Sequence, residues 1–117
     1  ETVVEEVQEE AQKVFKEVDV MPEFPGGMPE LVKYLGSIIK YPEAARKDGI
    51  SGRVYVSFIV NEEGYVLKAI PTNSVREDLD KEAVRAVLEM PKWSPGIKDG
   101  KAVSVEMVLP IAFVLDD

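Results

Sequence analysis

Three acidic residues near position 80 are the best candidates in this sequence for catalytic or metal-binding chemistry. Asp78, Asp80 and Glu82 could act as paired carboxylates or as metal ligands. They stand, however, at the expected start of a helix, where unpaired N–H groups and the helix dipole favour acidic side chains. The chain has no histidine and no cysteine, which most often supply a general base, a metal ligand or a thiolate. We therefore expect no catalytic site, no metal site and no cofactor.

The charge and size of the chain narrow the range of its partners. Its 117 residues carry a formal net charge of -8, and 45% of them are hydrophobic. A chain of this length supports one folded core. Its acidity argues against nucleic acid as a partner, because nucleic-acid affinity comes from clustered Lys and Arg. No run approaches the roughly 20 apolar residues of a membrane span. Because position 1 is not Met, we expect the chain to be a fragment of a longer protein.

The pattern of apolar residues predicts an α+β fold, a two-layer sandwich with an antiparallel sheet of about three strands. Alternating β-branched and aromatic residues mark the strands. The predicted strands are 53–60, 65–72 and 102–115. A helix over 79–89 has its apolar residues on one stripe and is expected to cover one face of the sheet. Two short helices, at 29–37 and 42–47, precede the sheet and begin at prolines.

Residues 1–20 differ from the rest of the chain in their high content of glutamate. Their apolar residues recur at helical spacing, yet the alternation of Val14, Val18 and Val20 would also suit a strand. Both interpretations remain open. We expect residues 1–20 to be the partly ordered end of an acidic linker and residues 21–117 to form the folded domain.

Pro110 lies inside the longest predicted strand and indicates that this strand has an open edge. Proline has no N–H to donate to a sheet, so its nitrogen should face away from any neighbouring strand. Backbone groups alternate in direction along a strand, so residues at even spacing from Pro110 share its outward direction. These residues are Ser104, Glu106, Val108 and Ala112. We expect their backbone groups to be available to a guest strand.

Four local motifs, in this order and spacing, resemble those of one protein family. They are Tyr41-Pro42-Glu43-Ala44-Ala45, Gly49-Ile50-Ser51-Gly52-Arg53-Val54, Val60-Asn61-Glu62-Glu63-Gly64 and Trp93-Ser94-Pro95-Gly96. The chain resembles the carboxy-terminal domain of TonB-type energy transducers in these motifs, and residues 21–27 are similar to versions found in Bacteroidetes. The resemblance covers residues from about 20 to 115, and the combination is far more specific than any single motif.

The resemblance implies a non-catalytic periplasmic domain of a protein anchored in the inner membrane. Such proteins couple to an ExbB/ExbD-type motor there and drive active transport through outer-membrane TonB-dependent receptors. In the family, the terminal domain binds a receptor segment, the TonB box, as a strand added beside its last strand. By family position, the resemblance adds Ile39, Lys40, Tyr41 and Arg53 to the expected receptor-binding residues.

Some of these residues also have ordinary structural explanations. Tyr41 could pack the start of a helix instead of contacting a guest strand, and Arg53 could pair with a neighbouring acid. Trp93, beside the end of the long helix, is expected in the core and not on a binding surface.

Two other functions stay open at this point. The same edge would also serve a TonB-like interaction domain of a membrane-anchored envelope sensor or peptidase. A small α+β hydrolase or ligand-binding enzyme would need a pocket with converging titratable groups, which a chain without His and Cys supplies poorly. An open edge also permits homodimers through edge pairing or domain swapping.

Overall fold

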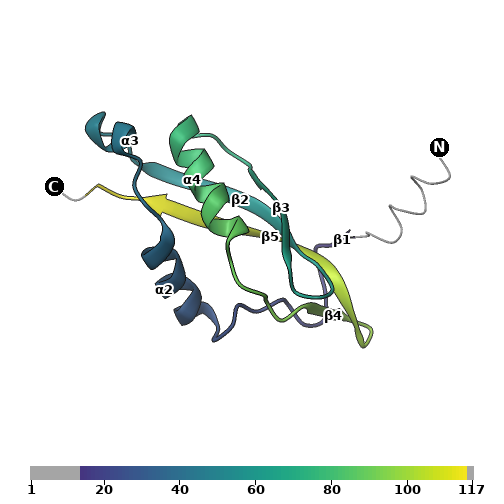
Figure 1. The fold of residues 1–117 in the computed structure, drawn as a ribbon. Helices are drawn as coiled ribbons and strands as arrows, with labels where there is room; N and C mark the ends of the chain where they lie inside the picture. Colours follow the sequence, from purple (N-terminus) through teal and green to yellow (C-terminus); the bar gives the residue numbers. More distant parts are fainter. Residues whose placement is uncertain (1–13, 116–117) are drawn as a thin grey trace, which may run out of the picture.

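The computed structural model describes residues 14–115, which form a twisted sheet with helices packed against one face (Figure 1). The elements are β1 (Val14–Phe15), α2 (Met28–Ile38), α3 (Glu43–Lys47), β2 (Gly52–Val60), β3 (Val66–Pro71), α4 (Glu77–Leu88), β4 (Gly96–Lys98) and β5 (Lys101–Phe113). This is the α+β sandwich that the sequence predicts. The three helices and the three longer strands lie within two residues of their predicted bounds.

Two short strands were not predicted. β1 has two residues and β4 has three, too few to show an alternating pattern. β1 pairs in parallel with β5, and β4 forms a hairpin with the start of β5. The order of the main strands is β1-β5-β2-β3. The boundary expected at residue 20 stays a prediction, and the helical pattern in residues 1–13 lies outside the described residues.

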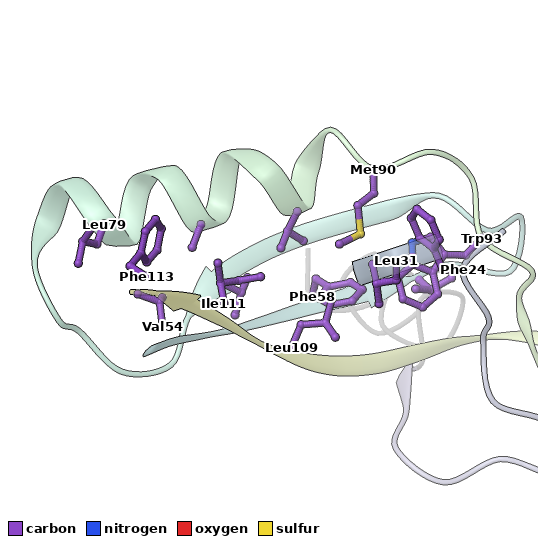
Figure 2. Packing of buried hydrophobic residues seen from close by; sticks show 14 of the residues in the cluster. Phe24, Leu31, Val54, Phe58, Leu79, Met90, Trp93, Leu109, Ile111 and Phe113 are labelled. Atoms are coloured by element: carbon purple, nitrogen blue, oxygen red, sulfur yellow. The ribbon is translucent and has the colours of Figure 1, made fainter. Parts of the chain in front are cut away.

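The core fills the space between the helices and one face of the sheet (Figure 2). The inward residues of β2 include Val54, Val56 and Phe58, and none of them is exposed to solvent. Their alternation with exposed or polar residues is the reason that this segment forms a strand with one buried face. α4 closes the core from above the sheet with a stripe of buried residues that includes Leu79 and Val87.

Trp93 belongs to this core, as the sequence predicts. Its side chain is 4% exposed. Its ring lies edge-on to Phe24, with centroids 5.7 Å apart, and packs against Phe58 at 5.6 Å. These contacts join the loop before α2 to the middle of β2, so the segment that leads into α2 is fixed against the sheet.

The opposite face of the sheet carries large apolar side chains that are exposed. We call it the open face and define it by Tyr55, Leu67, Ile70 and Val108, which are 38% to 59% exposed. Val108 and Ile70 stand on either side of Ser57 in one row across three strands. The helices therefore cover one face of the sheet and leave this one accessible.

Candidate peptide-binding edge

β5 is paired along one side and mostly unpaired along the other. β2 pairs with it continuously from Val105 to Phe113. On the other side, β1 covers Ser104 and Val105. From Glu106 to Phe113 no strand of the described part of the chain pairs with that other side. We call this free side of residues 106–113 the β5 edge.

The direction of the backbone groups at the β5 edge follows from the hydrogen bonds of β2. Tyr55 stands opposite Pro110. The Tyr55 N–H donates to Asn73 Oδ1 at 2.8 Å, and its carbonyl accepts from the Thr72 N–H at 2.8 Å. Both groups point away from β5, so Pro110 must also turn its backbone away from β2. The residues that share this outward direction are Glu106, Val108 and Ala112.

Ser104 is placed differently from the prediction. Its backbone has the outward direction, but it lies opposite Val14 of β1. Its groups are therefore covered and not free for a guest strand. The sequence did not predict this contact because β1 pairs with β5 over only two residues, which are too few to show an alternating pattern.

An apolar hollow lies beside the β5 edge on the helix side. It has a volume of about 190 Å³. The lining residues are Leu35, Gly36, Ile39, Pro110, Ile111 and Ala112. We call it the α2 hollow. Leu35 and Ile39 are half-buried and pack against the core, so the wall of the hollow has a fixed position. A strand that paired with the β5 edge would direct alternate side chains toward this hollow.

Glu82 and Arg85 of α4 hold the segment that follows α2. The Glu82 carboxylate accepts the N–H of Lys40 at 2.7 Å, and Arg85 donates to the carbonyl of Ile38 at 2.8 Å. Arg85 also binds the carboxylate through two hydrogen bonds, at 2.9 and 2.6 Å. The hydrogen bonds from Arg85 lower the pKa of Glu82 below its usual value. We call this pair the α4 clasp, and it positions Ile39 and Lys40.

Tyr41 is held by packing at the far end of β5. Its ring lies edge-on to Phe113, with centroids 5.6 Å apart, and its hydroxyl donates to the Ile50 carbonyl. The guanidinium of Arg46 lies 5.7 Å from the ring centroid. These contacts favour the structural explanation of Tyr41, although its side chain is only partly buried and lines a small hollow with Arg46 and Val114.

Arg53 has an exposed side chain at the same end of the sheet, opposite Ala112. It lines a shallow hollow with Tyr55 and Phe113. The ion pairs found among residues 14–115 do not include Arg53, so the expected acidic partner is not among the described residues.

The acidic residues near position 80 have structural roles. Asp80 accepts hydrogen bonds from the Val75 N–H at 3.2 Å and from Ser74 Oγ at 2.7 Å. Asp78 lies 3.4 Å from the Arg76 guanidinium. Within residues 14–115 no three His, Cys, Asp or Glu side chains are grouped so that they could hold a metal ion.

The structure thus places Glu106, Val108 and Ala112 along one edge and Ile39 in the hollow beside Ala112. Lys40 is bound to α4 through Glu82, and Tyr41 and Arg53 lie at the end of the sheet. Sequence reasoning missed the α2 hollow and the α4 clasp. Lys40 and Glu82 are 42 positions apart in the sequence, and no local sequence pattern links residues so distant.

The family described as Gram-negative bacterial TonB protein C-terminal matches residues 38–115. Two NMR solution structures of the Helicobacter pylori TonB-CTD, covering residues 194–285 and 179–285 of that protein, are similar, each with a TM-score of 0.56 and 26% identity. The matches cover 75% and 74% of this chain, and 92% and 78% of those chains.

No curated protein matches the chain in sequence. Within the described residues, every helix is too short or too polar to cross a membrane.

Proposed function

Because this chain belongs to the family of Gram-negative bacterial TonB C-terminal domains, we propose that its β5 edge binds the TonB box of outer-membrane receptors as an added strand. The observation that carries the proposal is the free side of β5 between Glu106 and Phe113, with the α2 hollow beside it. Strand addition takes affinity from main-chain hydrogen bonds and specificity from side-chain pockets. The β5 edge offers both.

The hydrogen-bonding capacity of the edge sets the strength of such a complex. Val108 and Ala112 each offer an N–H and a carbonyl, whereas Pro110 has no N–H and the Glu106 N–H pairs with β1, so these two offer a carbonyl alone. Each hydrogen bond contributes about 0.5 to 1.5 kcal/mol net. Most of these groups must be used at once to hold a peptide under force. A pull along the strand direction loads them together and not one after another.

The wider role follows from the family and is part of the proposal. The domain works in the periplasm, and other parts of the protein anchor it in the inner membrane and contact an ExbB/ExbD-type motor. The motor converts the proton gradient into force, and this domain transmits the force to the receptor. Its contribution is binding, and we assign it no catalytic step.

An NMR titration tests the binding proposal directly. The isotope-labelled domain is titrated with a synthetic TonB-box peptide, and backbone amide shifts are followed. We expect the largest shifts at Glu106, Val108 and Ala112, with smaller ones at Ile39 and Lys40. The amides of β3 serve as the internal control and should stay in place.

Two outcomes would contradict strand addition at β5. Shifts concentrated on β3 would move the binding site to the other side of the sheet. No shift with any TonB-box peptide would favour an interaction domain of an envelope sensor or peptidase, whose partner is a different protein.

A further inference from the structure

Glu106 is a carboxylate on the open face of the sheet, next to large apolar side chains. It is the only acidic residue in β5. Ile59 and Leu67 complete its row across the sheet, and Val108 and Ile70 stand in the next row. Val108 and Ile70 are 50% and 59% exposed. Glu106 is therefore the one acidic side chain of β5 that a strand added to the β5 edge would meet.

The carboxylate of Glu106 is oriented but only weakly neutralised. Ser57 Oγ donates a hydrogen bond to Oε2 at 3.1 Å. Because Ser57 is 8% exposed, this bond has a fixed direction. Among residues 14–115, the cation paired with it is Lys16, whose Nζ lies 4.0 Å from Oε1 on a side chain that is 79% exposed. An exposed pair at this distance contributes little to stability, so the anion is available to a better-placed cation.

The position of Glu106 at the β5 edge determines which guest side chain it meets. β1 ends at Phe15, opposite Val105, and in this parallel ladder the Phe15 carbonyl accepts the N–H of Glu106. Val108 is therefore the first residue of the β5 edge that can offer both its N–H and its carbonyl to a guest strand. In an antiparallel pair, directly opposite residues point to the same face, and diagonal neighbours lie about 7 to 8 Å apart, within reach of long side chains. The guest residue opposite Val108 therefore points onto the open face, and a long cationic side chain there reaches diagonally to the Glu106 carboxylate.

We propose that Glu106 selects receptor segments that carry Lys or Arg at the position opposite Val108, diagonal to the carboxylate, and that this cation displaces Lys16 from the carboxylate. The inference rests on the proposed strand addition at β5 and adds a charge rule to it. The rule applies to the side of the guest strand that faces away from the α2 hollow. Guest residues on the hollow side do not meet Glu106.

A charge scan of the peptide tests this rule. Synthetic TonB-box peptides carry Lys, Ala or Glu at each position in turn, and their Kd values are measured by calorimetry. At one position the Lys peptide should bind about fivefold tighter than the Ala peptide, and the Glu peptide weaker again, as expected for a cross-strand ion pair. Glu106→Gln should remove the preference while keeping an acceptor for Ser57, and Glu106→Lys should reverse it.

Glu62→Gln is the matched control, because it changes the net charge equally at an exposed residue in the β2–β3 turn. It should leave the preference intact. If the peptides bind but show no charge preference, or if Glu106→Gln keeps the preference, the charge rule is wrong and strand addition stands. If no peptide binds at all, the proposed function fails and the charge rule fails with it.

Discussion

The two outer edges of the sheet differ in regularity. β5 has 13 residues and pairs with β2 without interruption. β3 has six residues, and its pairing with β2 shifts between Ser57 and Ile59, where Lys68 adopts a φ of +54°. Edge strands invite pairing with other chains, and bulges are one way in which proteins prevent it. The edge formed by β3 is therefore irregular, whereas the β5 edge is regular.

β3 pairs with β2 only from Val56 to Val60, and the part of β2 before Val56 is also closed to a guest strand on that side. Beyond the end of β3, the side chain of Asn73 accepts from the Tyr55 N–H at 2.8 Å and donates to the Arg53 carbonyl at 3.0 Å. One amide side chain thus takes the place of a strand. Among the described residues, the β5 edge is therefore the longest regular stretch of backbone open to a guest.

The hollows beside the two edges show that size alone does not identify a strand-binding site. The hollow between β3 and α4 has a volume of about 550 Å³, whereas the α2 hollow has about 190 Å³. The larger one borders the bulged strand, where a continuous ladder cannot form. If main-chain hydrogen bonds supply the affinity, the smaller hollow beside the regular strand is the productive one.

The largest effect is expected from Val108→Pro. This change removes an outward N–H from the middle of the β5 edge and leaves the pairing with β2 intact, because that N–H points away from β2. Peptide affinity should fall about tenfold, the equivalent of about 1.4 kcal/mol, with one ladder bond lost and close approach hindered by the ring.

Val108→Ala is the control, since it keeps the N–H and should bind the peptide almost as the parent does. Titration calorimetry measures both variants, and circular dichroism checks their fold. Equal affinity of Val108→Pro and the parent would place the guest strand elsewhere, and the contrast between the two edges would lose its functional meaning.

The α2 hollow gives a second test, in which stability and binding should change in opposite directions. Gly36 lies inside α2, and a Cβ added there meets no atom within 4 Å. Gly36→Ala should stabilise the helix by about 0.5 to 1 kcal/mol. Gly36→Leu should fill the hollow and weaken peptide binding about fivefold, because guest side chains lose their space.

Leu88→Ala in the hollow beside β3 is the matched control and should leave peptide binding unchanged. Thermal unfolding and calorimetry on the same samples separate the two effects. A loss of affinity in Leu88→Ala together with normal binding by Gly36→Leu would reverse the assignment of the two hollows.

The α4 clasp makes the wall of the β5 site sensitive to acid. Arg85 lowers the pKa of Glu82 below its ordinary value of 4.5. A carboxyl with a lowered pKa in the folded state stabilises the fold above its unfolded pKa, and this contribution is lost as the pH falls through the folded value. As the pH falls below 4.5 and through the lowered pKa of Glu82, the parent should therefore lose stability that Glu82→Gln does not lose.

Urea unfolding at a series of pH values measures this difference. Glu62→Gln, at an exposed turn position, should keep the slope of the parent. Identical slopes for the parent and Glu82→Gln would mean that the clasp does not contribute through its charge.

The sequence predicted the features that depend on neighbouring residues. The alternation of Val54, Val56 and Phe58 is local, and so is the helical stripe of α4. Pro110 indicated the direction of the β5 backbone because a missing N–H is a property of one residue. These signals were sufficient to predict the longer helices and strands and to predict which residues of the last strand direct their backbone groups outward.

The features that were missed join parts of the chain that are distant in sequence. β1 covers Ser104 through a two-residue contact, the α4 clasp spans α2 and α4, and Asn73 closes β2 with its side chain. Each depends on the packing of whole elements. A polar residue on an exposed helix face has the same local sequence signature whether or not it meets a partner, so Glu82 could not be distinguished from a solvated side chain.

Lys68 tests whether the bulge in β3 serves to block pairing or only stores strain. A non-glycine residue at a φ of +54° is strained, and glycine adopts this conformation freely. Lys68→Gly should therefore raise the free energy of unfolding by about 0.5 to 1 kcal/mol, and thermal unfolding measures it. Peptide binding at the β5 edge should not change.

Lys on an edge strand also discourages pairing, so sedimentation at high concentration should show more self-association in Lys68→Gly than in Lys68→Arg, which keeps the charge. If both variants stay equally monomeric, the bulged backbone alone protects β3, and the charge at position 68 adds nothing to the difference between the two edges.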